Sequence, residues 1–330
     1  MKTIIFIFIT FAAIFSGCSS KEVYKPDVVV DDWENVSGSD VTISDISSSA
    51  ALLEDRRVLV NNQIVDIQID EENTLLGHSN GWILSATIDG NLTIANVKDK
   101  TKTEKFNLKR TIATASINGD ILAVLFANNE MALYSIPTKT LILKEQGDAP
   151  LVVNSKIVQP VFRDDLVIFS TLDGKIVIVQ ITTKKKLRTV IVGSEKHFNN
   201  VIFFELIDGK IVAATGNKIL SLSQKETRVS YDIRSVVSDG KNIFVATKQG
   251  EIISLSADLN QNAKLKFPFA HFLGMILHKD KLYALEKAGY LIEISKDLTQ
   301  HGVYEVDLEE GYVHIADKIF YVDDEYISVE

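Results

Sequence analysis

The sequence is poor in cysteine and has no excess of basic residues. Cys18 is the sole cysteine among 330 residues, so an internal disulfide is excluded. The 35 Lys and Arg are outnumbered by 44 Asp and Glu, which gives a formal net charge of −9. Because nucleic-acid-binding proteins show a basic footprint, this balance argues against nucleic acid as a partner.

Recognisable catalytic motifs are also lacking. The glycines stand singly in turns, without the G-x-G-x-x-G or G-x-x-x-x-G-K pattern of a phosphate loop, and no G-x-S-x-G elbow occurs. The histidines lack the His-x-x-x-His or Glu-x-x-His spacing of a helical metal site. They are His78, His197, His271, His278, His301 and His314. We therefore predict no catalytic, cofactor-binding or metal-binding residue, and no enzyme.

The apolar run Ile4–Ile14 is eleven residues long. A helix that crosses a bilayer needs ~20 residues, whereas the apolar core of a signal peptide has ~7–15. Ser16-Gly17-Cys18 follows, and with this run it resembles the lipobox of bacterial lipoprotein precursors, with Phe15 in place of the usual aliphatic residue. The resemblance implies that residues 1–17 are removed and that Cys18 carries lipid. The alternative is an ordinary secretory signal with an incidental cysteine.

Residues 18–47 have the composition of a flexible tether, rich in Asp, Ser, Lys and Glu and broken by Pro26 and Gly38. Trp33 in this stretch is expected to pack on the rim of the folded domain; the alternative is a partner-docking role. Ser19 after the cysteine is similar to the signal that sends enteric lipoproteins to the outer membrane. The predicted location is the outer membrane, facing the periplasm.

Residues 48–330 are expected to form one all-β domain built from a repeated phrase. Between Asp164 and Val192, Leu166–Thr171 and Lys175–Ile181 read as strands around an Asp173-Gly174 hairpin turn, and Leu187–Val192 reads as a third strand. The turn before the first strand recurs with spacings of 38, 46, 44, 31, 40 and 37 residues, counted on positions 81, 119, 165, 209, 240, 280 and 317. Repeats of about 40 residues predict the four-stranded antiparallel blades of a β-propeller, and a sandwich is the alternative.

The number of blades is open from the sequence. The last unit stops after Glu325–Val329, one strand short of a blade. We expect an N-terminal strand, Gln63–Ile69, to complete that blade and close a ring of seven. If Arg57–Ile69 instead starts a blade of its own, with Val41–Ile46 as the closing strand, the ring has eight.

The repeated phrase resembles the PQQ-type β-propeller superfamily, most clearly in residues 165–190 and 241–260. The closing T-G-x-x-x-W element of that superfamily is missing from nearly every unit, so binding of the quinone cofactor is not carried over. Together with the lipobox, a propeller of this size resembles the BamB family of the outer-membrane β-barrel assembly machinery. The resemblance implies a non-catalytic, membrane-anchored periplasmic scaffold with protein partners. The alternatives are a general envelope or surface adhesion propeller and, less favoured, a PQQ-dependent redox protein.

The basic cluster Lys184–Arg188 is interpreted as a solvated hairpin turn, with an anionic partner as the alternative.

Overall fold

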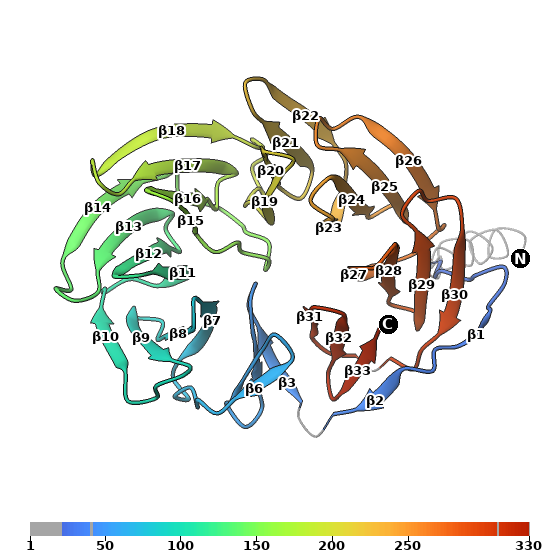
Figure 1. The fold of residues 1–330 in the computed structure, drawn as a ribbon, viewed down its shortest axis with the longest axis horizontal. Coiled ribbons are helices and arrows are strands. Elements are labelled where there is room, and N and C mark those ends of the chain that lie inside the picture. The colour runs from blue at the N-terminus through green and yellow to red at the C-terminus, as the bar shows by residue number, and fades with distance from the viewer. Residues whose placement is uncertain (1–21, 40–41, 309, 330) are drawn as a thin grey trace, which may run out of the picture.

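The computed structural model describes residues 22–39, 42–308 and 310–329, and within these ranges the chain forms eight antiparallel sheets arranged in a ring (Figure 1). Each sheet has four antiparallel strands, and one gains a fifth, parallel strand at its edge. The all-β propeller with four-stranded blades is therefore confirmed. The favoured count of seven blades is wrong, because the described residues form eight.

The blades are numbered here in chain order, each written from its first strand. Blade 1 consists of β3 (Ile43–Ile46), β4 (Ala51–Leu53), β5 (Val58–Val60) and β6 (Gln63–Val65), and blade 2 of β7 (Thr74–Ser79), β8 (Trp82–Ala86), β9 (Asn91–Asn96) and β10 (Thr103–Asn107). Blade 3 consists of β11 (Ile112–Asn118), β12 (Ile121–Phe126), β13 (Glu130–Ser135) and β14 (Leu141–Gln146), and blade 4 of β15 (Val161–Arg163), β16 (Leu166–Ser170), β17 (Lys175–Gln180) and β18 (Lys185–Ile191). Blade 5 consists of β19 (Phe203–Ile207), β20 (Lys210–Ala214), β21 (Lys218–Leu222) and β22 (Glu226–Ser230), and blade 6 of β23 (Ile233–Ser238), β24 (Asn242–Thr247), β25 (Glu251–Ser256) and β26 (Gln261–Lys266). Blade 7 consists of β27 (Phe272–His278), β28 (Lys281–Glu286), β29 (Tyr290–Ser295) and β30 (His301–Glu305), with β1 (Asp31–Asp32) at its edge. Blade 8 consists of β31 (Val313–Ala316), β32 (Ile319–Val322), β33 (Glu325–Ser328) and β2 (Val36–Gly38).

The seven repeated turns join the first and second strands of blades 2 to 8. Asn80-Gly81 and Asp208-Gly209 have positive φ at both residues (47° and 80°, 48° and 72°), as a two-residue type I′ hairpin requires. The first strand of each blade lies toward the centre of the ring and the fourth toward its rim (Figure 1). The blade that the repeat does not show is blade 1, which precedes the first recognised turn.

The strand expected to complete the last blade was wrongly placed. Gln63–Val65 is β6 and pairs with β5 inside blade 1. Within the alternative closing strand, Val41–Ile46, the residues Ile43–Ile46 form β3, the first strand of that same blade. The fourth position of blade 8 is occupied by β2, which pairs antiparallel with β33 through Val36 opposite Ile327 and Gly38 opposite Glu325.

The middle strands are apolar because blades pack face to face and cover both of their surfaces. In β12, every residue from Leu122 to Phe126 is at most 1% exposed. Leu122 packs with Leu84 of blade 2 on one face, while Ala123 packs with Phe169 of blade 4 on the other. Outer strands are polar because their side chains lie at the rim of the ring, where solvent reaches them, and β18 is exposed at most of its positions. The core is therefore a series of apolar layers between successive blades.

The described part of the predicted tether lies against the propeller. Tyr24 is 5% exposed, with ring centroids 6.1 Å from Phe267 and 5.6 Å from Tyr290. Strand β1 then runs parallel to β30, and the Trp33 Nε1 donates to the Ser328 carbonyl at 2.9 Å. The packing interpretation of Trp33 is confirmed. No helix in residues 22–39, 42–308 or 310–329 is long and apolar enough to cross a membrane.

Candidate protein-docking face

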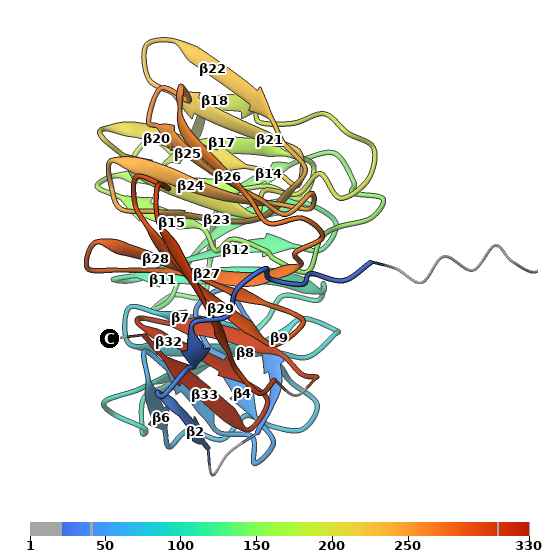
Figure 2. The same cartoon turned by 90° about the vertical axis from the view of Figure 1, so that its right-hand side faces the viewer.

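Two connections between blades stand out by length. Residues 147–160 lead into blade 4 and residues 192–202 lead into blade 5, whereas the next longest connection is residues 66–73. Figure 2 shows the long yellow-green connections on the same side of the ring as the first described residues. Long loops on a rigid scaffold are where binding residues concentrate, so this side is the first candidate for function.

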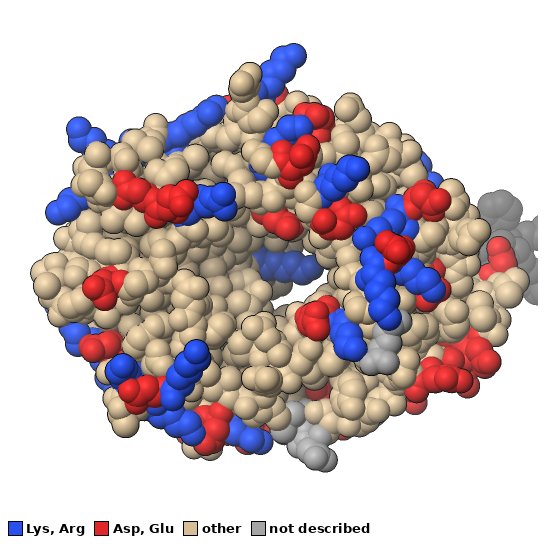
Figure 3. All heavy atoms as spheres, viewed as in Figure 1, with Lys and Arg blue, Asp and Glu red and all other residues tan. Residues whose placement is uncertain are grey.

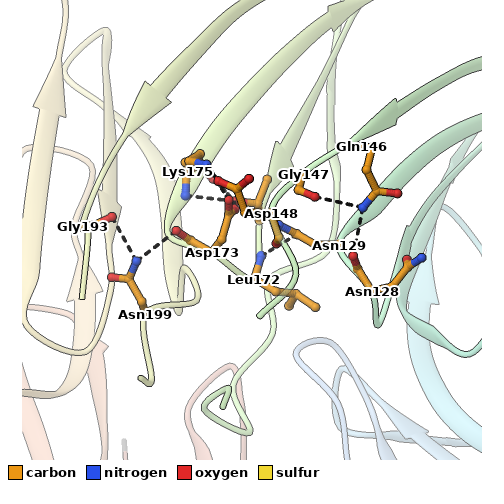
Figure 4. A network of polar contacts seen from close by, with 11 residues as sticks. Asn128, Asn129, Gln146, Gly147, Asp148, Leu172, Asp173, Lys175, Gly193 and Asn199 are labelled. Carbon is orange, nitrogen blue, oxygen red and sulfur yellow. Dashed lines mark hydrogen bonds and ion pairs between the residues drawn. The ribbon is translucent and has the colours of Figure 1, made fainter. Parts of the chain in front are cut away.

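Two buried asparagines fix the bases of these loops (Figure 4). The Asn129 Nδ2 donates to the Asp148 carbonyl at 2.8 Å, at the start of the first loop. The Asn199 Nδ2 donates to the carbonyls of Asp173 (2.9 Å) and Gly193 (3.0 Å), which joins the second loop to a turn of blade 4. The Asn129 Oδ1 also accepts from the Leu172 N–H at 2.9 Å, so each buried amide bonds the backbone at two points and holds its loop in one arrangement.

An ion-pair cluster lies beside these bases. The Lys175 Nζ is 2.6 Å from carboxylate oxygens of both Asp148 and Asp173. Burial alone would raise the pKa of Asp173, but hydrogen bonds from Lys175, Thr171 and Asn129 outweigh it and hold the pKa below its usual value. Desolvation would lower the pKa of Lys175, yet its two carboxylate partners raise it. The cluster therefore stabilises the fold above the usual pKa of an aspartate, and the contribution of Asp173 is lost as the pH falls through its lowered pKa.

The two loops are bonded to each other as one unit. The Asn200 side chain is fully buried, accepts from the Asn154 backbone N–H at 2.6 Å and donates to the Lys156 carbonyl at 2.8 Å. The Phe198 N–H donates to the Val152 carbonyl at 2.9 Å. A partner that contacts one loop would therefore contact both.

The ends of the loops expose apolar side chains. Leu151 is 75% exposed, Val152 43% and Phe198 55%, and we call these three residues the apolar tip. Phe198 also has φ of +53°, a backbone conformation that is rare for a bulky residue and is found at functional sites. Exposed apolar residues grouped on a preformed surface mark sites of protein interaction.

The first loop also reaches the central channel. The Gln159 Nε2 donates to the Ala115 carbonyl of β11 at 2.9 Å, and the Lys156 Nζ donates to the Arg234 carbonyl of β23 at 3.3 Å. Because β23 belongs to blade 6, two blades further round the ring than blade 4, this contact places Lys156 within the channel. A cavity of about 380 Å³ lies beside Gln159 and is also lined by Asn80 and Ser116.

The structure does not bear on the one predicted modification site, since Cys18 lies outside the described residues. Within the described ranges, no group of three or more His, Cys, Asp or Glu side chains is arranged to hold a metal ion.

Most of the basic cluster Lys184–Arg188 belongs to strand β18 and not to a hairpin turn. There Lys186 pairs with Glu145 at 2.6 Å and Arg188 with Glu226 at 2.8 Å, so its charges are partly matched by neighbouring blades.

The sequence interpretation missed the two loops, although a signal was present. The two longest spacings between repeated turns, 46 and 44 residues, are the ones that contain residues 147–160 and 192–202. Spacing shows that a loop is long, but it does not show that two loops meet or that their apolar ends stay exposed.

No protein-family model matches the chain. Two sequence relatives are named plasminogen-binding protein PgbB, from Helicobacter pylori strains J99 and 26695. The first is 30% identical over 224 residues, covering 63% of this chain and 41% of that protein. The second is 26% identical over 370 residues, covering 93% of this chain and 68% of that protein. This chain thus matches less than half the length of the first relative.

Solved structures with similar folds include BamB from Moraxella catarrhalis, with a TM-score of 0.67 and 12% identity, covering 89% of this chain and 98% of that one. The C-terminal WD40 domain of Sif2 has a TM-score of 0.60 and 13% identity, covering 94% and 100%. At such identities the likeness shows the propeller fold and nothing finer.

Proposed function

We propose that this chain is a lipid-anchored, non-catalytic propeller that binds a protein near the membrane surface. The observation that carries the proposal is the apolar tip, displayed on two cross-bonded loops on the side of the ring where the described chain begins. Such a surface suits recognition of another protein, because it offers apolar area on a backbone that is already ordered.

The anchor would keep this side of the ring close to the bilayer. Glu22 follows Cys18 by four positions, and a fully extended chain of four residues spans about 14 Å. Tyr24 is already packed against blade 7, so a lipid on Cys18 would give the domain little reach. Two or more acyl chains hold a protein stably on a membrane, where one holds it marginally. We place the protein at the outer membrane, facing the periplasm.

The partner we favour is the outer-membrane β-barrel assembly machinery. The lipobox-like residues Ser16-Gly17-Cys18 and the BamB-like ring support this assignment. In this role the propeller would hold a membrane-bound subunit through its apolar tip and assist the assembly of β-barrel proteins.

A second candidate is a surface-exposed binding protein, and the name of the two sequence relatives favours it. By this alternative the same tip would face the exterior and bind an extracellular protein such as plasminogen.

The test is an affinity pull-down from detergent-solubilised envelopes with the tagged full chain. We expect assembly subunits to elute with wild type and not with the double variant Leu151→Asp, Phe198→Asp. The matched control is Ile88→Asp, because Ile88 is also 75% exposed but lies on a turn of blade 2. A deletion strain should show reduced porin levels. Unchanged porins and no assembly subunit in the eluate would contradict the favoured partner.

Two measurements test the second candidate. Purified protein is passed over immobilised plasminogen, and intact cells are treated with protease. Saturable binding that the double variant loses, together with cleavage on intact cells, would replace the periplasmic assignment. Protection from protease and no binding would eliminate this alternative.

A further inference from the structure

A lysine side chain from one loop reaches the backbone of an arginine on a blade further round the ring. Lys156 comes from the loop before blade 4 and Arg234 from β23 of blade 6, and the Lys156 Nζ donates to the Arg234 carbonyl at 3.3 Å. Figure 3 shows basic atoms inside the central opening of the ring. The Arg234 charge is near enough to Lys156 to act on it, so two cations from separate blades lie close together.

No carboxylate neutralises this pair among the residues that the structure describes. Neither side chain forms an ion pair there, and the Arg234 Nε is buried without a hydrogen-bond partner. Asp232, two residues earlier, accepts a hydrogen bond from Gln249. Glu205 is engaged with Ser238, at the opposite end of β23. Two positive charges that lie near each other without a counter-charge repel, so an anion bound between them would be stabilising.

The electrostatics agree with this geometry. Desolvation lowers the pKa of Lys156, and the nearby positive charge of Arg234 lowers it further. Lys156 nevertheless has a solvent-exposed side chain. Exposure combined with desolvation is expected for a group in a narrow, water-filled channel that protein surrounds.

The propeller fold does not require an arginine at this position. Arg234 is the extra residue of a β-bulge, lying between the Ile233 and Ser235 pairs with β24. The same bulge recurs in the first strands of blades 1, 2, 3 and 7, where the extra residue is Ser44, Leu76, Ala113 and Leu273, respectively. Small or apolar side chains are therefore compatible with the bulge. The bulge does not explain the positive charge of Arg234 in blade 6.

We propose that Lys156 and Arg234 bind an oxyanion, a carboxylate or phosphate group, within the channel. Arginine presents a planar set of donors that matches such groups, and lysine adds a compact positive charge. The anion would supply a counter-charge for both side chains and relieve the repulsion between the two cations. This inference does not depend on lipidation or on docking at the apolar tip.

The test is isothermal titration calorimetry at low ionic strength with inorganic phosphate and, separately, with acetate. The variants are Lys156→Met and Arg234→Met, and the control is Lys225→Met, which removes the same charge from an exposed turn of blade 5. Loss of one charge-assisted contact should weaken binding roughly tenfold to a hundredfold. Because Lys156 is exposed, its replacement should leave the fold intact, and far-ultraviolet circular dichroism checks this for each variant.

Saturable binding by wild type and the control, weakened in both channel variants, would support the site. The relative affinities for phosphate and acetate would then identify the preferred oxyanion. Absence of saturable binding of either anion to wild type would overturn the proposal. Equal affinity in all four proteins, or equal weakening by Lys225→Met, would also overturn it, since either result indicates general surface charge.

Discussion

Two inter-blade interfaces of the same ring differ sharply in what they bury. The layer between blades 2 and 3 contains fourteen buried apolar residues, Leu84, Leu122 and Phe126 among them. The layer between blades 8 and 1, which we call the seam, contains four among the described residues, with Tyr321 packed against them. Those four are Ile43, Ala51, Leu53 and Leu59. The ring is thus least apolar where its first and last blades meet.

Strand length explains the difference. Strands β4, β5 and β6 have three residues each, and β31, β32 and β33 have four, whereas β12 has six and β11 has seven. Because side chains alternate between the two faces, a three-residue strand presents one or two residues to a neighbouring blade. Short strands therefore leave little apolar area for the seam to bury.

Polar contacts hold much of the seam. The Ile43 N–H donates to the Asp323 carbonyl at 3.2 Å, and the Tyr321 hydroxyl lies 3.4 Å from the Asn62 side chain. An intramolecular hydrogen bond contributes ~1 kcal/mol net, less than a fully buried leucine. We therefore expect the ring to open first at the seam.

The largest expected effect is that of Leu122→Ala, within the apolar layer between blades 2 and 3. The substitution leaves a cavity among closely packed neighbours and should lower the free energy of unfolding by about 4 kcal/mol. Urea denaturation followed by circular dichroism measures the change. If Leu122→Ala lowered the free energy of unfolding by less than Leu59→Ala in the seam, the expected difference between the two interfaces would be wrong.

That matched variant is Leu59→Ala. Leu59 is 3% exposed but has few apolar neighbours, so we expect a loss of about 2–3 kcal/mol. Hydrogen exchange should show faster exchange in blades 1 and 8 than in blades 2 and 3. Uniform acceleration around the ring would show that the seam does not open independently.

Acid should weaken blade 8 through His314, a buried residue of β31 whose ring lies 6.3 Å from that of Tyr321. Burial disfavours the imidazolium and lowers the pKa of His314 to about 4. The unfolded chain takes up this proton near pH 6.5, so the stabilisation is complete above that pH and is lost as the pH falls toward 4. At pH 5 the loss should be about 2 kcal/mol.

Urea denaturation at pH 7 and pH 5, on wild type and His314→Gln, isolates this effect. Other titrating groups, such as Asp173, act in both proteins and cancel. Equal losses in the two proteins would show that His314 is not responsible.

The smallest effect is expected for Arg188→Met, at the outer rim between blades 4 and 5. The Arg188–Glu226 pair is 2.8 Å long, but both side chains are at least one-third exposed. Exposed ion pairs contribute roughly 0.2–1 kcal/mol and are screened by salt. Denaturation at low and high salt checks this, and a loss similar to that of Leu59→Ala would contradict our ranking of apolar layers over rim charges.

Blade 1 marks the limit of what the repeated sequence pattern predicts. The seven recognised turns join strands that are mostly five to seven residues long, and their alternation and turn residues are visible in the sequence. Strands such as Ala51–Leu53 and Val58–Val60 are too short to display a period, so their blade was predicted only as the alternative. The fourth strand of blade 8 was misplaced because Val36–Gly38 lies in a polar stretch and gains its strand conformation by pairing with β33.

The candidate docking face was less accessible to sequence reasoning than the fold. The apolar tip consists of ordinary residues in long loops, which no sequence motif marks. Only the tertiary structure shows that the backbones of Phe198 and Val152 are hydrogen-bonded to each other while their side chains stay exposed.

The sequence by itself determined the all-β class, the recurring hairpins and the apolar middle strands, because turn chemistry and side-chain alternation are local properties. Tertiary structure alone decided which distant segments meet. Trp33 reaches Ser328 across 295 residues of chain, and Lys156 reaches Arg234 across 78. Ring geometry creates those contacts, since neighbours around a closed ring can be far apart along the chain and no local pattern encodes their pairing.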